Sequence, residues 1–124
     1  MNGGAQSRVF SLPPVSSALL QNGWKVYAVQ RPELPLISIH LVIACGAEAD
    51  SPGKAGLSNL SAEMLTLGTK KRSASQLAAE VDGRGATLSA HSGWNSTSLH
   101  IFGLNEDFEQ LMNLLLELYT QPAF

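Results

Sequence analysis

Residues 36–45 carry the strongest structural signal in this chain, because apolar and polar side chains alternate along them. Ile37, Ile39, Leu41, Ile43 and Cys45 alternate with Ser38, His40, Val42 and Ala44. Successive side chains of a β-strand point to opposite faces of the sheet, so the alternation gives this strand one wholly apolar face and one mixed face. We therefore expect a sheet that is covered by helices on one face.

Other segments predict further strands and helices. Residues 24–30 are rich in β-formers and follow the turn signal Asn22-Gly23. Ser51 followed by Pro52 predicts a helix start, because the hydroxyl caps free N–H groups and proline presets φ at the first helical position. Apolar residues at helical spacing extend this helix to residue 67, and Gly68 ends it.

The second half of the chain also predicts both helices and strands. A capping box, Ser73-Ala74-Ser75-Gln76, begins a second helix that Gly83 stops. Residues 86–92 and 95–102 are expected to pair as a hairpin, and the last helix is expected to begin at Asn105. The basic run Lys70-Lys71-Arg72 between the first two helices is interpreted as a solvated link.

The last helix carries more apolar surface than a surface helix needs, because Leu104, Leu114 and Leu118 widen its apolar stripe. We expect Leu114 and Leu118 to be buried by a further half of the domain. The order β-β-α-α-β-β-α predicts an α+β fold, a layered mixed β-sheet with helices packed on one face. The expected organisation is an N-terminal extension or loop over residues 1–17 and one incomplete domain over residues 18–124.

Composition excludes several classes of protein. The chain is 44% hydrophobic and 15% charged, which excludes disorder, and its net charge of −2 gives no electrostatic basis for nucleic-acid binding. No stretch has the length of a membrane span. The lone Cys45 excludes an intrachain disulfide framework and a thiolate zinc cage. Residues 1–8 do not read as a secretory signal, so the compartment stays open between periplasm, cytoplasm and organellar matrix.

Several motifs occur in an order that points to one family. The longest is Gly46-Ala47-Glu48-Ala49-Asp50-Ser51-Pro52-Gly53-Lys54-Ala55-Gly56-Leu57, with Gly68-Thr69, Gly85-Ala86-Thr87-Leu88-Ser89-Ala90 and Pro122-Ala123-Phe124 after it. Together they resemble the N-terminal part of the insulinase/pitrilysin-like zinc metallopeptidases, the inverzincins. The resemblance covers about residues 18–124 and implies a truncated half of an insulinase-like domain.

In active members of that family, the helix after the Gly-Leu pair carries His-x-x-Glu-His. Its two imidazoles hold Zn²⁺, and its glutamate takes a proton from the metal-bound water. The resemblance places Asn59, Ala62 and Glu63 at these positions. A neutral amide is a poor zinc ligand, a methyl group accepts no proton, and one carboxylate is not a metal site. The resemblance therefore implies no catalytic residue and no metal or other cofactor here, with zinc expected only in an active partner or repeat.

The segment Thr87, Leu88, Ser89 and Ala90 has two interpretations. It is an ordinary strand after a helix-to-sheet turn, or it is an edge strand that accepts an extended peptide through main-chain hydrogen bonds. The family resemblance favours an edge, although active relatives usually carry Asn where this chain has Ser89. Both interpretations stay open at this point.

The resemblance implies a non-catalytic subunit or half. It would serve as a scaffold for a partner that bears His-x-x-Glu-His, as in a heterodimer, and would hold unfolded peptide for that partner. One alternative is a zinc metalloendopeptidase whose active site lies in another repeat of a longer protein. The other is a purely structural subunit, like the core subunits of respiratory complexes.

The three histidines are further candidate metal ligands. Alternation lets His40 and His100 share one sheet face, with His91 in the same hairpin. No acidic or cysteine side chain lies at ligand spacing from them, so the pattern favours solvated histidines on a half-exposed sheet.

Overall fold

The computed structural model describes residues 11–124, which divide into two compact units. The first unit, which ends at Leu34, is a β-hairpin in which β1 (Val15–Leu19) pairs antiparallel with β2 (Lys25–Val29). The predicted turn is present: Gly23 has a φ of 86°, and the Trp24 N–H donates to the Asn22 side chain at 3.1 Å.

Strand β1 was not predicted. It begins at Val15, so the loop expected over residues 1–17 includes the start of a strand, and residues 1–10 of that expectation lie outside the described residues. The sequence Val-Ser-Ser-Ala-Leu has weak β-propensity, and its strand conformation depends on pairing with β2 across the turn.

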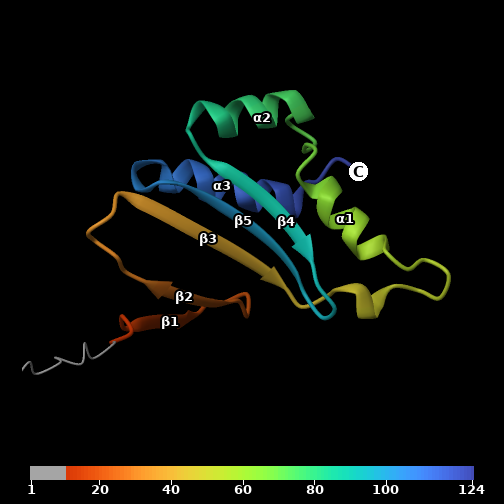
Figure 1. The fold of residues 1–124 in the computed structure, drawn as a ribbon, viewed down its shortest axis with the longest axis horizontal. Helices are drawn as coiled ribbons and strands as arrows, with labels where there is room; N and C mark the ends of the chain where they lie inside the picture. Colours follow the sequence, from red (N-terminus) through yellow and green to blue (C-terminus); the bar gives the residue numbers. More distant parts are fainter. Residues whose placement is uncertain (1–10) are drawn as a thin grey trace, which may run out of the picture. The chain divides into compact units, whose positions relative to one another are not determined.

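The second unit, Pro35–Phe124, contains the remaining elements (Figure 1). They are β3 (Leu36–Ile43), the short 3₁₀ helix η1 (Ala47–Ala49), α1 (Leu57–Leu65), α2 (Ala74–Gly83), β4 (Thr87–Ser92), β5 (Thr97–Leu104), η2 (Asn105–Asp107) and α3 (Phe108–Thr120). The strand order is β3-β5-β4. The α+β class is confirmed. A mixed sheet was expected, and this was wrong for the described residues. Every strand pair there is antiparallel: β1 with β2, and β5 with both β3 and β4.

The alternation along β3 is confirmed by its burial. Ile37, Ile39, Leu41 and Ile43 pack against the core, whereas Ser38, His40 and Val42 are exposed on the opposite face. The register with β5 places His40 opposite His100 and Ile39 opposite Ile101. One face of this sheet therefore meets the helices, and the other face remains exposed in the second unit.

The core joins the sheet to all its helices. Its buried members are Leu65, Leu77, Val81, Ala86, Leu99, Ile101, Leu111, Leu114, Leu115 and Leu118. The expectation that Leu114 and Leu118 await a missing half was wrong, because they are 3% and 0% exposed within this chain. Side chains from α1, α2 and β5 meet the buried leucines of α3 in one cluster, whereas Leu104, which also widened the predicted stripe, is 38% exposed.

Helix α1 begins at Leu57, so the predicted start near Pro52 was wrong. Gly53 and Gly56 have φ values of 81° and 94°, in the left-handed region that does not continue a right-handed helix. The helix ends at Leu65, so the predicted extension to residue 67 was also wrong. Leu57, Leu60 and Leu67 are 47%, 54% and 59% exposed, and the buried residues of α1 are Ala62 and Leu65. The Ser-Pro pair lies in the loop before the helix.

Helix α2 follows its prediction closely at the start. Ser73 and Gln76 form the expected reciprocal capping box, with the Ser73 N–H donating to the Gln76 side chain at 2.9 Å. The end differs, since Gly83 is helical and the left-handed residue is Gly85, with a φ of 62°. No helix in the described range 11–124 has the length and apolar character to cross a membrane.

A polar network ties the α1–α2 link to α3. Arg72 forms ion pairs with Glu80, at 2.7 Å, and with Glu117, whose other oxygen accepts the Thr69 hydroxyl at 2.5 Å. Lys70 and Lys71 are exposed as expected for a solvated link, but Arg72 is only 30% exposed, so that interpretation was wrong for Arg72. The hydrogen bond from Arg72 is the main cause that lowers the pKa of Glu117 below its ordinary value of 4.5.

We expect Glu117→Gln to lower the free energy of unfolding by about 1–3 kcal/mol at neutral pH, since it breaks charge-assisted bonds to a half-buried arginine. A carboxyl with a depressed folded-state pKa stabilises the fold above its unfolded pKa, and this contribution is lost as the pH falls through the folded value. The difference between the variant and the wild type should therefore shrink below about pH 4.5. Urea unfolding at a series of pH values measures it.

The matched control is Glu109→Gln, an exposed glutamate on the same helix. It should leave the unfolding free energy nearly unchanged. A Glu117→Gln deficit that stays constant down to acid pH would contradict the role given to the carboxylate.

Candidate functional site

The positions that the family resemblance assigns to the zinc motif lie on α1. Asn59 and Glu63 are exposed and one helical turn apart, so they share one face of the helix. Ala62 is 1% exposed and points inward. It lines a recess of about 300 Å³, together with Ile43, Cys45, Ala49, Asp50, Leu57, Ser58, Ser61, Leu65 and Thr97. Asn59 and Glu63 are thus at the surface of α1, whereas Ala62, their neighbour on the helix, is covered and lines the recess.

A polar anchor holds the N-terminus of α1. The Asp50 carboxylate accepts hydrogen bonds from the Gly56 N–H at 2.9 Å and the Ser58 N–H at 3.0 Å. The Ser58 hydroxyl lies 2.5 Å from the same carboxylate, and this hydrogen bond is the main cause that lowers the pKa of Asp50 below 3.8. Asp50 therefore acts as a cap from outside the helix, a role that the sequence analysis gave to Ser51.

Gly46 fixes the other end of this anchor. A Cβ at Gly46 would lie 2.5 Å from the Gly93 carbonyl oxygen and 2.7 Å from the Ser96 nitrogen. The Ser58 hydroxyl also lies 3.0 Å from the Gly46 carbonyl oxygen. The loop that leads into α1 is thereby pressed against the β4–β5 turn, where only glycine fits. The motif from Gly46 to Leu57, which carries the family resemblance, thus positions α1 through these contacts.

The potential metal ligands around α1 are sparse. Within residues 11–124, no three His, Cys, Asp or Glu side chains form a group that could hold a metal ion. Glu63 offers one carboxylate, and its neighbour on the same face, Asn59, offers a neutral amide. Zinc in proteins is held by three or four nitrogen, sulfur or carboxylate ligands, so this face does not resemble a zinc centre.

Strand β4 lies at one edge of the three-stranded sheet, with β5 as its neighbour. Thr87 and Ser89 are exposed, whereas Leu88 and Ala90 are half-buried against the core. An edge strand presents unpaired main-chain N–H and C=O groups that can pair with another extended chain. The residues that the sequence analysis singled out, Thr87, Leu88, Ser89 and Ala90, therefore occupy an edge, and their binding role stays a prediction.

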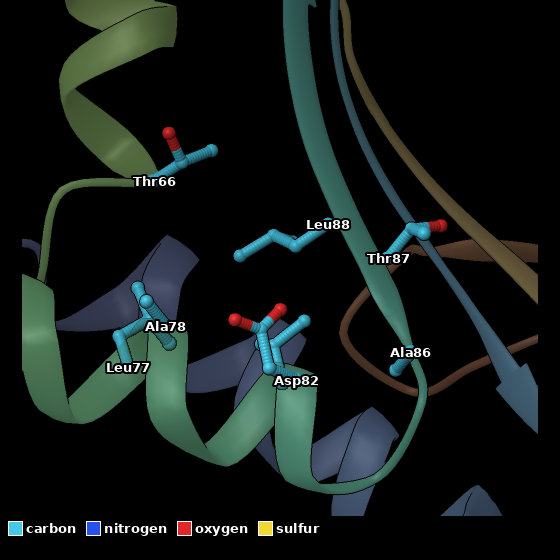
Figure 2. A pocket seen from close by; sticks show the side chains of 8 residues that line it. Thr66, Leu77, Ala78, Asp82, Ala86, Thr87 and Leu88 are labelled. Atoms are coloured by element: carbon cyan, nitrogen blue, oxygen red, sulfur yellow. The ribbon is translucent and has the colours of Figure 1, made fainter.

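A groove adjoins this edge strand (Figure 2). It has a volume of about 340 Å³ and is lined by Thr66, Leu77, Ala78, Val81, Asp82, Ala86, Thr87 and Leu88. Figure 2 shows Leu88 extending from β4 over α2, with Asp82 on the helix beneath it and Thr66 across the space. The lining is largely apolar, with the Asp82 carboxyl at its side. The groove was not predicted from the sequence, because its lining comes from α2, the start of β4 and Thr66 after α1, which are separated along the chain.

A known protein family matches most of this chain. The family description Insulinase (Peptidase family M16) matches residues 25–124. The chain belongs to the insulinase family. An uncharacterized zinc protease of Rickettsia bellii is 27% identical over 105 residues, which are 85% of this chain and 26% of that protein. Subunit 1 of the mitochondrial cytochrome b-c1 complex of Bos taurus is 28% identical over 108 residues, 87% of this chain and 22% of that subunit.

Solved structures agree on the fold. A peptidase M16 inactive domain from Pseudomonas fluorescens superposes with a TM-score of 0.80 at 26% identity, covering 89% of this chain and 27% of that one. A protease from Helicobacter pylori gives a TM-score of 0.82 at 20% identity, covering 91% and 27%. The chain thus spans about a quarter of the length of the relatives it matches.

We expect Asp50→Ala to loosen the start of α1, because it removes the acceptor of the Gly56 and Ser58 amide protons. These two amides should exchange with solvent faster than in the wild type, and the melting temperature should fall at neutral pH. The pKa of Asp50 is depressed in the folded state, so the stabilisation is present above about pH 3.8 and is lost as the pH falls further.

Hydrogen exchange followed by NMR measures the effect at single residues. Glu48→Ala, an exposed acid in η1, is the control and should leave both amides protected. Unchanged protection of Gly56 and Ser58 in Asp50→Ala would contradict the capping role.

Proposed function

We propose that this chain is a non-catalytic part of an insulinase-family protein, which holds unfolded peptide and scaffolds an active partner bearing His-x-x-Glu-His. The observation that carries the proposal is the identity of Asn59, Ala62 and Glu63 on α1. The partner is a separate subunit of a heterodimer or another repeat of a longer protein.

The chemistry of these side chains argues against hydrolysis by α1. Zinc peptidases need imidazole or carboxylate ligands and a base that accepts a proton from the metal-bound water. The neutral Asn59 amide competes poorly with imidazole, and the Ala62 methyl group accepts no proton.

Two relatives support a non-catalytic role. One solved structure with the same fold is described as a peptidase M16 inactive domain. A second relative is a subunit of the cytochrome b-c1 complex, and so functions within an assembly. The insulinase fold therefore occurs in proteins whose names give them no peptidase activity, and these precedents support a scaffolding role for this chain.

The peptide-holding part of the proposal depends on β4 and the groove beside it. An extended peptide would add to the free edge of β4 through main-chain hydrogen bonds, which require no particular sequence. Thr87 and Leu88 belong both to this edge and to the groove lining, so a side chain of the peptide could enter the groove. Ala78 and Val81 give the groove an apolar wall, which favours an apolar side chain.

The similarity to cytochrome b-c1 subunit 1 favours a second candidate, a purely structural subunit without peptide binding. A third candidate is a zinc metalloendopeptidase whose active site lies in another repeat, since this chain spans about a quarter of the zinc protease from Rickettsia bellii. Peptide binding separates the first two candidates. An intact His-x-x-Glu-His motif elsewhere in the same protein would favour the third.

We expect the chain to retain no stoichiometric zinc at α1 after dialysis and to cleave no peptide alone, because Asn59 and Ala62 cannot complete the site. Elemental analysis of the dialysed protein measures the metal. Glu63→Ala is the matched variant, since Glu63 is the remaining acidic group at the motif positions. One equivalent of zinc that is lost in Glu63→Ala would overturn the proposal.

We expect Ala78→Phe to weaken binding of an unstructured, fluorescein-labelled peptide by about tenfold, because the larger side chain fills the groove. Ala79→Phe is the control: Ala79 is exposed on the same helix and does not line the groove. Fluorescence anisotropy measures the affinity. Equal affinity in all three proteins would remove the groove from the proposal, and no binding by the wild type would favour the structural subunit.

A further inference from the structure

The exposed face of the sheet carries a pair of histidines at its centre. His40 of β3 lies directly opposite His100 of β5, with ring centroids 4.0 Å apart and ring planes inclined by 10°. The Ser38 hydroxyl oxygen lies 2.8 Å from His100 Nε2 and 3.3 Å from His40 Nε2. Both Nε2 atoms therefore converge on one oxygen atom at the surface of the sheet.

We propose that His40 and His100 form a binding site for a divalent transition-metal ion on the exposed face of β3 and β5. Both ligands would be Nε2 atoms, and water would fill the remaining positions. The site uses no residue of α1, so it is independent of the degenerate zinc motif. Imidazole nitrogen suits Cu²⁺, Ni²⁺ and Zn²⁺, and the general order of affinity places Cu²⁺ first.

The pair needs a side-chain rearrangement before both rings can bind one ion. The rings are nearly parallel and each Nε2 lone pair lies in its ring plane, so at least one ring has to turn out of the stack for the two lone pairs to meet. Metal–nitrogen bonds to histidine are about 2.0–2.1 Å, shorter than the 2.8 Å and 3.3 Å that separate the two Nε2 atoms from the Ser38 oxygen, so the rings must also approach and the Ser38 hydroxyl must turn away. His40 is exposed and has room to turn its ring. The Cα atoms are held by the pairing of β3 with β5, so only side-chain torsions have to be ordered when the ion binds.

The side chains around the histidine pair on these strands carry no fixed charge. The side chains facing the pair from β3, β4 and β5 include no carboxylate and no Lys or Arg: they are Ser38, Val42, Thr87, Ser89, His91, Ser98 and Phe102. A cation at the pair therefore meets no repelling Lys or Arg side chain on these three strands.

The proposal departs from the expectation of solvated histidines for one reason. That expectation required an acidic or cysteine side chain at ligand spacing. Each histidine instead has the other histidine as its partner, because the β3–β5 register places His40 opposite His100. With protein ligands from these two residues alone, the ion would exchange readily, unlike one in a closed structural zinc site.

The test is calorimetric titration of the untagged full chain with Ni²⁺ at neutral pH. All proteins carry Cys45→Ser, because the exposed Cys45 thiol would itself bind metal. We expect one equivalent of Ni²⁺ to bind, with affinity falling about tenfold or more in His40→Ala and in His100→Ala. His91→Ala is the matched control, since it removes a histidine from the same face but keeps the pair, and its affinity should stay within about twofold.

Either of two results would overturn the proposal. Unchanged Ni²⁺ affinity in His40→Ala and His100→Ala would place the ion elsewhere. Absence of Ni²⁺ binding by the Cys45→Ser protein would show that the pair does not bind the metal. Circular dichroism checks that each variant is folded. A second measurement needs no variant: Zn²⁺ should shift the ring proton signals of His40 and His100 together in the NMR spectrum and leave those of His91 in place.

Discussion

Strand β5 is the element on which the second unit depends. It pairs with β3 along one side and with β4 along the other, and its inward side chains Leu99 and Ile101 are 0% exposed. The same apolar face receives α3, whose buried leucines complete the cluster with α1 and α2. Because these contacts share one buried face of the sheet, a single core positions the three α-helices and the two edge strands. The opposite face of the sheet and the free edge of β4 are outside that core.

The loop before α1 positions that helix through contacts that are independent of the residues at the predicted zinc-motif positions. Gly46, Asp50 and Ser58 hold α1 by close backbone contact and hydrogen bonds, none of which involves Asn59, Ala62 or Glu63. The helix position and the zinc ligands are thus physically separable. The proposed non-catalytic role is therefore compatible with the match to the insulinase family over residues 25–124, because the contacts that place α1 do not require zinc ligands.

Local patterns predicted those elements whose stabilising partners are near in sequence. The β4–β5 hairpin and the Ser73–Gln76 capping box appear in the structure. Strand β3 was also predicted, because its own alternation identifies it although its partner β5 is distant in sequence. Errors arose where distant groups decide. Asp50, not Ser51, caps α1 across a loop, and Arg72 leaves solvent because Glu80 and Glu117 reach it from two helices. Leu114 and Leu118 were assigned to a missing half because their cover comes from elements far along the chain.

The sequence by itself determined the α+β class, the family and the side chains at the motif positions, since these depend on residue identity and short-range periodicity. The tertiary structure alone decided that β4 is an edge, that a groove runs between α2 and β4, and that His40 stacks on His100. Each of these depends on strand register and helix placement, which are set by burial of one shared core. That burial is a property of the folded chain, and no short segment of the sequence contains it.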